Sequence, residues 1–339
     1  MSRLTLLLPG LLGSFTGMPD EEKPGFPAIE SLLARAGRQQ ISRRSFYSDL
    51  CDLCALDKPA GGDLPVAPLG RLIDGAEHPD GIWMRADPVH LAVGRDSVRL
   101  HDSASLSMTQ HDAIIFAAAL EGLFKEYNWK LEVPLPERWY VRLPHKPAIT
   151  THEIDYVTGK DIQSFLPSGP ESNQWLRLTN EVQMLLHACD INQEREQRGA
   201  PAINSLWFWG IGALPGILPR KWTRIYSNDP AAQGLAMLSG TEFLQLPEQF
   251  NAAENGFESG DDVLLACATA LTGTRHQDIN KWLESLEQLE QNWFEPIAVA
   301  VNRKLLDELI VISDGYEFII NRYSPLRFWR RRRSVIDYG

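Results

Sequence analysis

The sequence has few cysteines, no long apolar run and no excess of basic residues. Four cysteines are scattered over 339 residues, which argues against a disulfide framework and favours a reducing compartment. No stretch approaches the roughly 20 apolar residues of a membrane-spanning helix, so we expect no membrane span. Acidic residues outnumber basic ones by 44 to 33, and the net charge of −11 argues against general nucleic-acid binding. We therefore expect a cytoplasmic globular protein.

The first residues superficially resemble a secretory signal. Leu4–Leu8 is apolar, but Pro9 and Gly10 interrupt the run and no small-residue cleavage site follows. We expect residues 4–8 to form a buried first strand rather than a targeting segment.

Apolar strand-like runs alternate with amphipathic segments along the rest of the chain. Further strands are predicted at residues 203–209, 263–267 and 309–312, with short, partly exposed strands within 130–143. Helices are predicted at residues 27–37, 107–127, 171–198 and 281–293, and a loop at 58–70. Such alternation is typical of an α/β fold with a mostly parallel central sheet and helices on both faces.

A short charged cluster lies beside one strand-like segment. Arg85, Asp87, His90 and Arg95 fall within eleven residues. Two guanidinium groups and an imidazole can hold a phosphate or carboxylate, and histidine is a natural acid–base group. The alternative is structural, with Asp87 capping a helix and His90 packing inside it.

A second polar group follows a predicted helix end. Asn192 and Asn204 have amides that can position a polar ligand, and Arg195 and Arg198 can supply positive charge. The structural alternative pairs these arginines with neighbouring glutamates on a solvated helix.

Two tryptophans, Trp207 and Trp209, occupy the strand-like run that follows. We favour a core position for both.

These segments carry a family resemblance. The run Asn192-x-x-Arg195-x-x-x-Gly199-x-Pro201-Ala202-x-Asn204, followed by Trp209-Gly210 and Gly212, resembles archaeal-type cofactor-independent phosphoglycerate mutases of the alkaline-phosphatase-like superfamily. The stretches Leu178-Thr-Asn180-Glu181 and Arg85-Ala-Asp-Pro-Val-His-Leu91 are similar to segments of the same family. The whole chain is more similar still to the proteobacterial group called RpfE-type regulatory proteins.

The resemblance implies a domain organisation. Residues 1–94 and 161–339 would form the alkaline-phosphatase-like core, and residues 95–160 a small inserted α+β subdomain. A ligand would lie in a cleft between them, lined by residues 83–95 and 192–212, near the carboxyl ends of the strands.

The family's catalytic residues are largely missing from this chain. The mutases use a serine nucleophile and two divalent metals, but Ala86 stands at the nucleophile position. The first strand ends in Leu8-Pro9-Gly10, where the family has an Asp ligand, and Thr272–His276 is the nearest stretch to the central Asp-x-x-Gly-His run. Only Asp314 has a counterpart, as a vestigial ligand. Because two metals need several carboxylates or imidazoles, we expect no metal and no cofactor.

The hypothesis that we favour is a catalytically degenerate phosphoglycerate-mutase-like protein with a regulatory or anionic-ligand-sensing role, and the question of residual enzyme activity, as a mutase-like isomerase or a phosphatase, stays open. Arg85, His90, Arg95 and Arg195 would hold the small anionic ligand. The first alternative is a metal-independent mutase or phosphate-ester hydrolase, with His90 as nucleophile or base and Asp87 orienting it.

The second alternative is a protein-interaction module. Its docking element would be the C-terminal run Arg327-Phe-Trp-Arg-Arg-Arg-Arg333, which combines five arginines with Phe328 and Trp329. Finally, Cys51-x-x-Cys54 is a lone pair, whereas a structural zinc site needs four ligands.

Overall fold

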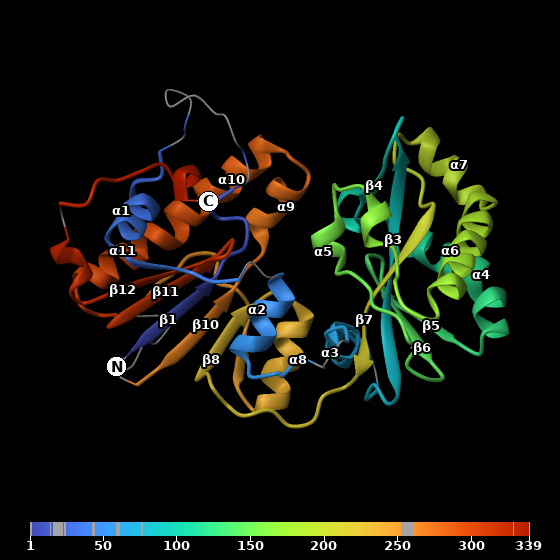
Figure 1. Ribbon diagram of the computed structural model, residues 1–339, viewed down its shortest axis with the longest axis horizontal. Helices are drawn as coiled ribbons and strands as arrows, with labels where there is room; N and C mark the ends of the chain where they lie inside the picture. Colours follow the sequence, from blue (N-terminus) through green and yellow to red (C-terminus); the bar gives the residue numbers. More distant parts are fainter. Residues whose placement is uncertain are drawn as a thin grey trace. The chain divides into compact units, whose positions relative to one another are not determined.

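The computed structural model describes residues 2–13, 15, 23, 25–42, 45–58, 62–75, 77–251, 260–327 and 329–338. The chain divides into two compact units, each with its own sheet (Figure 1). The first unit comprises Met1–Leu56 and Ile217–Gly339, and the second comprises Asp57–Gly216.

The unit boundaries differ from those that the resemblance implies. Both expected boundaries, at residues 95 and 160, fall inside the second unit. The reason is strand β3, Ile82–Val93, which pairs with three other strands of that unit and so belongs with them.

The first unit holds a seven-stranded sheet in the order β2-β12-β11-β1-β10-β8-β9. Its strands are β1 (Arg3–Leu7), β2 (Gly37–Gln40), β8 (Arg224–Ser227), β9 (Glu242–Leu244), β10 (Asp262–Ala266), β11 (Glu308–Ser313) and β12 (Tyr316–Asn321). Pairing is parallel from β11 across to β9, and antiparallel at β11–β12 and β12–β2.

The sheet is therefore mixed, whereas the sequence predicts a mostly parallel one. The difference arises at Asp314 and Gly315, which have φ values of 48° and 87°. Two successive positive φ values are typical of a tight hairpin turn, and this turn sends the chain back along β11 as β12. Ser313 and Tyr316 pair directly across it.

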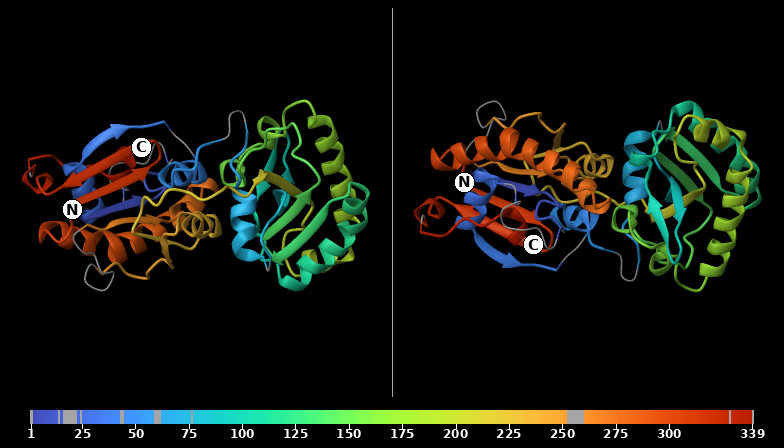
Figure 2. Two further views of the ribbon diagram at one scale, coloured as in Figure 1. Left: turned by 90° about the horizontal axis from the view of Figure 1, so that it is seen from below. Right: turned by 90° about the horizontal axis from the view of Figure 1, so that it is seen from above.

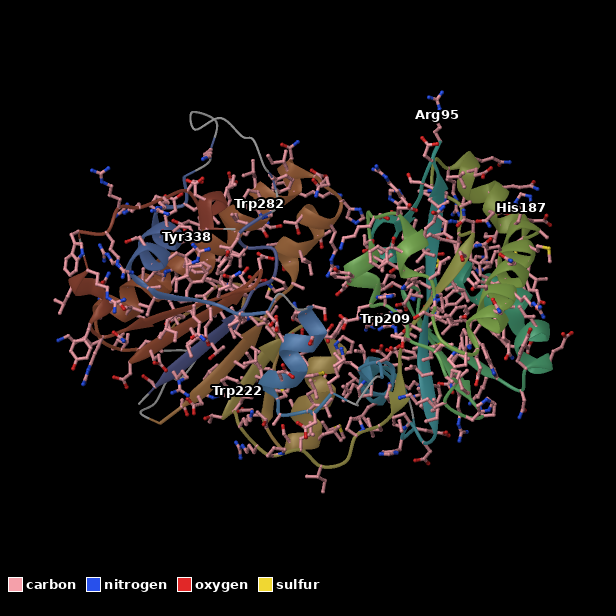
Figure 3. The ribbon with its side chains drawn as sticks, viewed as in Figure 1. Arg95, His187, Trp209, Trp222, Trp282 and Tyr338 are labelled. Atoms are coloured by element: carbon pink, nitrogen blue, oxygen red, sulfur yellow. The ribbon has the colours of Figure 1, made fainter. Side chains whose placement is uncertain are left out.

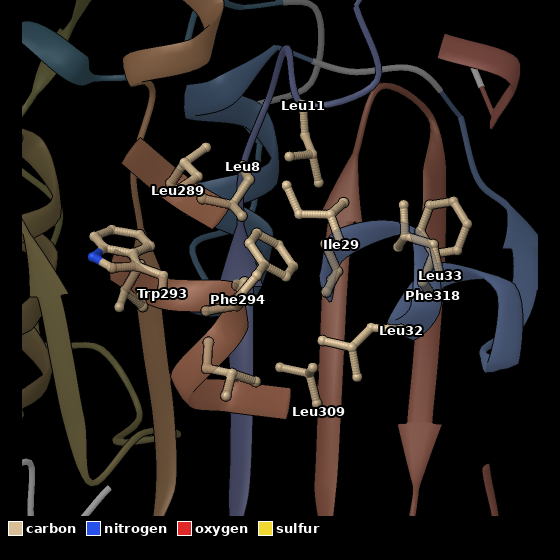
Figure 4. Close-up of a cluster of buried hydrophobic side chains, with 14 of the residues drawn as sticks. Leu8, Leu11, Ile29, Leu32, Leu33, Leu289, Trp293, Phe294, Leu309 and Phe318 are labelled. Carbon is tan, nitrogen blue, oxygen red and sulfur yellow. The ribbon is translucent and has the colours of Figure 1, made fainter. Parts of the chain in front are cut away.

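Apolar side chains fill one face of the first sheet. The helices of this unit are α1 (Pro27–Arg35), α2 (Phe46–Leu53), α8 (Pro230–Ser239), α9 (Thr269–Arg275), α10 (Ile279–Leu289) and α11 (Glu295–Asn302). Helices α1, α10 and α11 share one buried cluster with the sheet, which includes Leu8, Ile29, Phe294 and Leu309 (Figure 4). Figure 2 shows α10 and α11 running along this side of the sheet.

The other face of the first sheet is covered by different helices. Side chains alternate along a strand, so the buried Leu7 and Ala266 point away from the cluster that holds Leu6 and Leu265. Helix α2 contacts β1, and α8 contacts β8 and β9.

The second unit holds an antiparallel sheet. Strands β4 (Val98–His101), β3, β6 (Arg138–Leu143) and β5 (Lys130–Leu135) follow one another, and β7 (Ser205–Ala213) also pairs with β3. Its helices are α3 (Val66–Asp74), α4 (Gln110–Glu126), α5 (Ile154–Val157), α6 (Ser172–His187) and α7 (Asp190–Gln197). Helix α3 lies on one face of the sheet, and α4 and α6 lie on the other (Figures 1 and 2).

Several predicted boundaries shift. The helix predicted from residue 107 begins at Gln110, because Thr109 accepts the backbone N–H of Asp112 at 3.1 Å and caps it. The helix predicted over 171–198 is two helices, α6 and α7, which separate at Ala188 and Cys189. The loop predicted over 58–70 includes the start of α3. No helix in the described part of the chain is long and apolar enough to cross a membrane.

A buried carboxylate holds the start of α1. Glu290 begins a π-helical turn, Glu290–Phe294, between α10 and α11, and is 5% exposed. Its two oxygens accept the backbone N–H groups of Ala28 and Ile29 at 2.5 and 2.9 Å. Because no side chain at the N-cap position of α1 does this, the first turn of α1 depends on Glu290.

We predict that Glu290→Ala lowers the free energy of unfolding by about 1–3 kcal/mol, because it leaves two buried N–H donors without an acceptor. Urea denaturation monitored by circular dichroism measures this change. Glu287→Ala, at an exposed position near the end of the preceding helix α10, is the matched control. Equal effects of the two substitutions would contradict this role of Glu290.

Candidate functional site

Arg85 and Asp87 form a buried ion pair in strand β3. Arg85 Nε and Nη2 donate to Asp87 Oδ1 at 2.9 and 2.7 Å, and the side chains are 7% and 2% exposed. Trp209 Nε1 donates to Asp87 Oδ2 at 2.7 Å, and the Trp139 backbone N–H reaches Oδ1 at 3.4 Å. The Arg85 guanidinium lies 5.2 Å from the centroid of the Tyr140 ring. The pair is thus enclosed by its own unit.

Opposing influences act on the Asp87 carboxyl. Burial is the largest and raises its pKa above the usual value, while Arg85 and the hydrogen bond from Trp209 act to lower it. Both carboxylate oxygens of Asp87 accept hydrogen bonds from residues of the same unit.

Ala86 lies on the opposite face of the same strand. Side chains alternate along a strand, and Ala86 is fully buried in the apolar cluster beneath α4 and α6, next to Met84 and Phe208. The residue that the resemblance places at the nucleophile position is therefore a core residue of the second unit.

His90 does not pair with Asp87. The two residues are three apart on β3, so they project to opposite faces. His90 Nδ1 lies 2.8 Å from the Ala202 carbonyl oxygen, and its ring centroid lies 6.0 Å from that of His101. The arrangement in which Asp87 orients His90 is absent.

Arg195 is fully buried and holds three elements together. Its Nη1 donates to Asp112 Oδ2 at 2.8 Å, its Nε donates to the Pro201 carbonyl at 3.1 Å, and its Nη2 donates to the Leu106 carbonyl. The partner is Asp112 of α4 rather than the neighbouring glutamates that the sequence suggests. Burial alone would raise the pKa of Asp112, but the hydrogen bonds from Thr109 and Arg195 outweigh it and lower that pKa.

The two asparagines replace missing backbone partners. Asn192 Nδ2 donates to the carbonyls of Leu186 and Ile203 at 2.8 and 2.9 Å, and its Oδ1 accepts the N–H of Ile203 at 2.8 Å. Asn204 bonds to both backbone groups of Leu91, accepting its N–H at 2.7 Å and donating to its carbonyl at 3.0 Å. Both amides are therefore used within the fold.

Arg198 and Arg95 keep accessible guanidinium groups. The Arg198 side chain is 53% exposed and lies 3.6 Å from Asp112. Arg95 is exposed in the turn after β3 and points away from the unit (Figure 3). Arg85 thus pairs with Asp87, and Arg195 and Arg198 both lie near Asp112. The expected anion-binding residues are not gathered around one cavity.

Asp314 follows β11, at the edge of the first sheet where β1 also ends. Its Oδ1 accepts the Gly10 N–H at 3.0 Å, and its Oδ2 accepts the Leu12 N–H at 3.1 Å and the Ser313 hydroxyl at 2.7 Å. The Gly10 carbonyl accepts the Trp282 indole N–H at 2.8 Å. The carboxylate therefore fixes the loop after β1 at two backbone N–H groups.

Glycine is required at position 10 of this loop. Its φ is +84°, and a Cβ there would lie 2.8 Å from the Leu271 backbone. The chain is therefore tightly packed where it leaves β1 at Gly10.

The residues present do not fit the two divalent metals that the resemblance implies. Asp314 already accepts three hydrogen bonds, and no group of three or more His, Cys, Asp or Glu suited to a metal occurs among the described residues. Cys51 and Cys54 are buried free thiols on and just after α2, and burial raises the pKa of Cys54 to about 12. That thiol is protonated at neutral pH and a poor nucleophile or ligand.

A surface cavity of about 360 Å³ lies elsewhere in the second unit. Residues of α4 and β5 line it, among them Phe124, Lys125, Trp129 and Lys130. None of the candidate site residues named from the sequence contributes to it.

Sequence reasoning missed the residues that decide these roles. Asp112 is 83 positions from Arg195 and shows only as part of a helix cap, and the donors to Asp314 are backbone N–H groups, which every residue carries. At the carboxyl end of β11, the residue pair Asp314-Gly315 is a local sequence signal, because Asp-Gly is typical of a tight hairpin turn.

The fold and geometry define an α/β protein of two units. No family model matches the chain. A comparison with curated proteins finds a weak sequence similarity to a cofactor-independent phosphoglycerate mutase.

One sequence relative is the 2,3-bisphosphoglycerate-independent phosphoglycerate mutase of Methanosarcina barkeri. It is 24% identical over 107 residues, which are 30% of this chain and 27% of the mutase. The match thus spans about a quarter of that relative's length.

Two solved structures align over most of the chain. The PH0037 protein from Pyrococcus horikoshii aligns with a TM-score of 0.53 and 15% identity, over 94% of this chain and 87% of that one. The cofactor-independent phosphoglycerate mutase from Thermoplasma acidophilum aligns with a TM-score of 0.43 and 16% identity, over 94% and 88%. The likeness to the PH0037 protein shows a shared fold.

We predict that Arg195→Gln lowers the free energy of unfolding at pH 7 by about 3 kcal/mol, because it removes the buried guanidinium partner of Asp112 and leaves only the exposed Arg198 near that carboxylate. The folded-state pKa of Asp112 is below its usual 3.8, so the pair stabilises the protein above that pH and loses its effect as pH falls. The difference between wild type and variant therefore shrinks in acid. Urea titrations between pH 3 and 7 measure it.

The control for this experiment is Arg198→Gln. Its exposed guanidinium approaches the same carboxylate, so its loss costs under about 1 kcal/mol. Similar small losses for both variants would rule out the buried pair as a structural anchor.

We also predict that Asp314→Asn destabilises the metal-free protein by about 1–3 kcal/mol, because the new amide opposes a backbone N–H donor. Thermal unfolding in EDTA tests this, with Glu287→Gln as the exposed control. A stabilised Asp314→Asn variant would identify Asp314 instead as an under-satisfied ligand whose charge the fold tolerates at a cost.

Proposed function

We propose that this chain is a catalytically degenerate, phosphoglycerate-mutase-like protein of the RpfE type, which acts in regulation by binding rather than by turnover. The observation that carries the proposal is the set of hydrogen bonds that the Asp314 side chain accepts from its own fold. Its carboxylate accepts N–H groups from Gly10 and Leu12 and the hydroxyl of Ser313, and so holds the exit of β1.

This bonding makes Asp314 a poor metal ligand. Turning the carboxylate outward would leave two backbone donors unpaired, at about 1–3 kcal/mol each. The loop cannot follow easily, because Trp282 holds the Gly10 carbonyl and Leu271 packs against Gly10. In addition, the carboxyl end of β1 offers Leu8 and Pro9 where a ligand-bearing side chain would be needed.

The proposed anion sensing is limited to groups that remain accessible. Arg85 and Arg195 are neutralised inside the second unit by Asp87 and Asp112, so an anion would have to displace a buried carboxylate to reach them. Arg198 is more than half exposed, and we assign any small anionic ligand of this unit to the surface around it.

No observation favours the alternative of a metal-independent enzyme. That mechanism needs His90 beside Asp87, and the two project from opposite faces of β3. His90 Nδ1 is directed to a backbone carbonyl instead.

The test is an assay of 3-phosphoglycerate isomerisation and of p-nitrophenyl phosphate hydrolysis, with and without added Mn²⁺. We expect wild type, Asp314→Asn and His90→Ala to give the same background rate, since none has a working nucleophile. Turnover that is lost in Asp314→Asn would support a metal-dependent mutase, and turnover that is lost in His90→Ala would support the histidine mechanism; either would overturn the proposal.

A further inference from the structure

A basic segment without acidic residues lies close to the C-terminus of the sequence. From Arg322 to Ser334 the sequence carries six arginines and no Asp or Glu. The other 27 basic and 44 acidic residues leave the rest of the chain with a net charge of −17. Positive charge is therefore concentrated in one short segment of the first unit.

The described part of this segment is fixed to the unit. Arg327 donates to the Arg35 carbonyl at 3.1 Å, and Arg330 donates to the carbonyls of Ala36 and Ala34 at 2.7 and 3.5 Å. These carbonyls end helix α1, where a positive charge also offsets the helix dipole. Beyond them, Val335 and Tyr338 are buried in the cluster that covers the sheet, and Figure 3 shows Tyr338 within this unit.

Several other described side chains of the segment face solvent. Arg322, Arg331 and Arg333 are exposed, and no ion pair to them is found within the described ranges. Tyr323, Leu326 and Trp329 are exposed by 57%, 63% and 68%. We call these six residues the C-terminal basic surface. Phe328, which the sequence also suggested as a docking residue, lies outside the described residues.

We propose that the C-terminal basic surface docks a short acidic segment of a partner protein, one in which Asp or Glu residues alternate with large apolar side chains. Tryptophan, tyrosine and arginine are the residue types that dominate binding energy at protein interfaces. Because the segment is already anchored to α1 and to the core, docking would order little of this chain's own backbone.

The charge distribution favours a short acidic segment over a nucleic acid or a membrane. A duplex or an anionic bilayer presents continuous negative charge and would also face the acidic remainder of the chain. A short segment can lie within the basic surface alone, because charges beyond about 8 Å are largely screened at physiological salt. The apolar side chains of the partner would then cover Leu326 and Trp329.

The probe is a short fluorescein-labelled peptide of glutamates interrupted by leucine and phenylalanine, titrated with the full chain and followed by anisotropy. We expect saturable, salt-sensitive binding that Arg331→Glu/Arg333→Glu weakens at least about tenfold and Trp329→Ala weakens about tenfold. These positions are exposed, so both variants should unfold thermally as wild type does.

The matched control is Val93→Ala/Arg95→Glu, which removes an exposed apolar residue and an exposed arginine from the second unit. It should bind the peptide as wild type does. Absence of binding, or equal weakening by the control, would overturn the proposal. Tighter binding to phosphatidylserine-containing vesicles or to duplex DNA than to the peptide, lost in Arg331→Glu/Arg333→Glu, would overturn the choice of partner.

Discussion

The carboxylate of Asp314 fixes the carboxyl end of the first sheet. It sits in the turn that closes the β11–β12 hairpin and accepts N–H groups from the loop that leaves β1, so one side chain joins two neighbouring strand ends. The same loop receives the Trp282 indole on the Gly10 carbonyl, which ties in α10. Open α/β sheets bind ligands where parallel strands end. In this chain part of that edge is occupied by its own hydrogen bonds and packing.

In the second unit, buried charged side chains likewise pair with one another. Its two most buried arginines, Arg85 and Arg195, each meet a carboxylate that is at most 2% exposed. Buried pairs of this kind are costly to break, because either partner alone would be an uncompensated charge. Arg195 also accounts for the position of α7, since it bonds to the Leu106 and Pro201 carbonyls as well as to Asp112. Residue types that suggested a ligand site therefore serve to fix the fold.

The sequence predicted the parts of this structure that depend on local pattern. The apolar runs at 4–8, 263–267 and 309–312 are adjacent parallel strands, and Trp207 and Trp209 are buried as expected. It failed where distant residues decide the outcome. Nothing near Arg195 identifies Asp112 as its partner, and nothing near residues 83–95 reveals that β7 joins β3 in a separate antiparallel sheet. The sequence groups Arg85, Asp87 and His90 as one site, but they lie on a single long strand, β3, whose side chains alternate between two faces. Without knowing that the segment is one strand, the opposite directions of Asp87 and His90 could not be predicted.

We infer that Asp314 is committed to the fold and not to a metal. Calorimetric titration of the chelator-treated protein with Mn²⁺ measures this, with Asp314→Asn titrated in parallel. We predict no stoichiometric binding to either protein. Binding of one or two Mn²⁺ per chain that disappears in Asp314→Asn would show instead that Asp314 is a metal ligand.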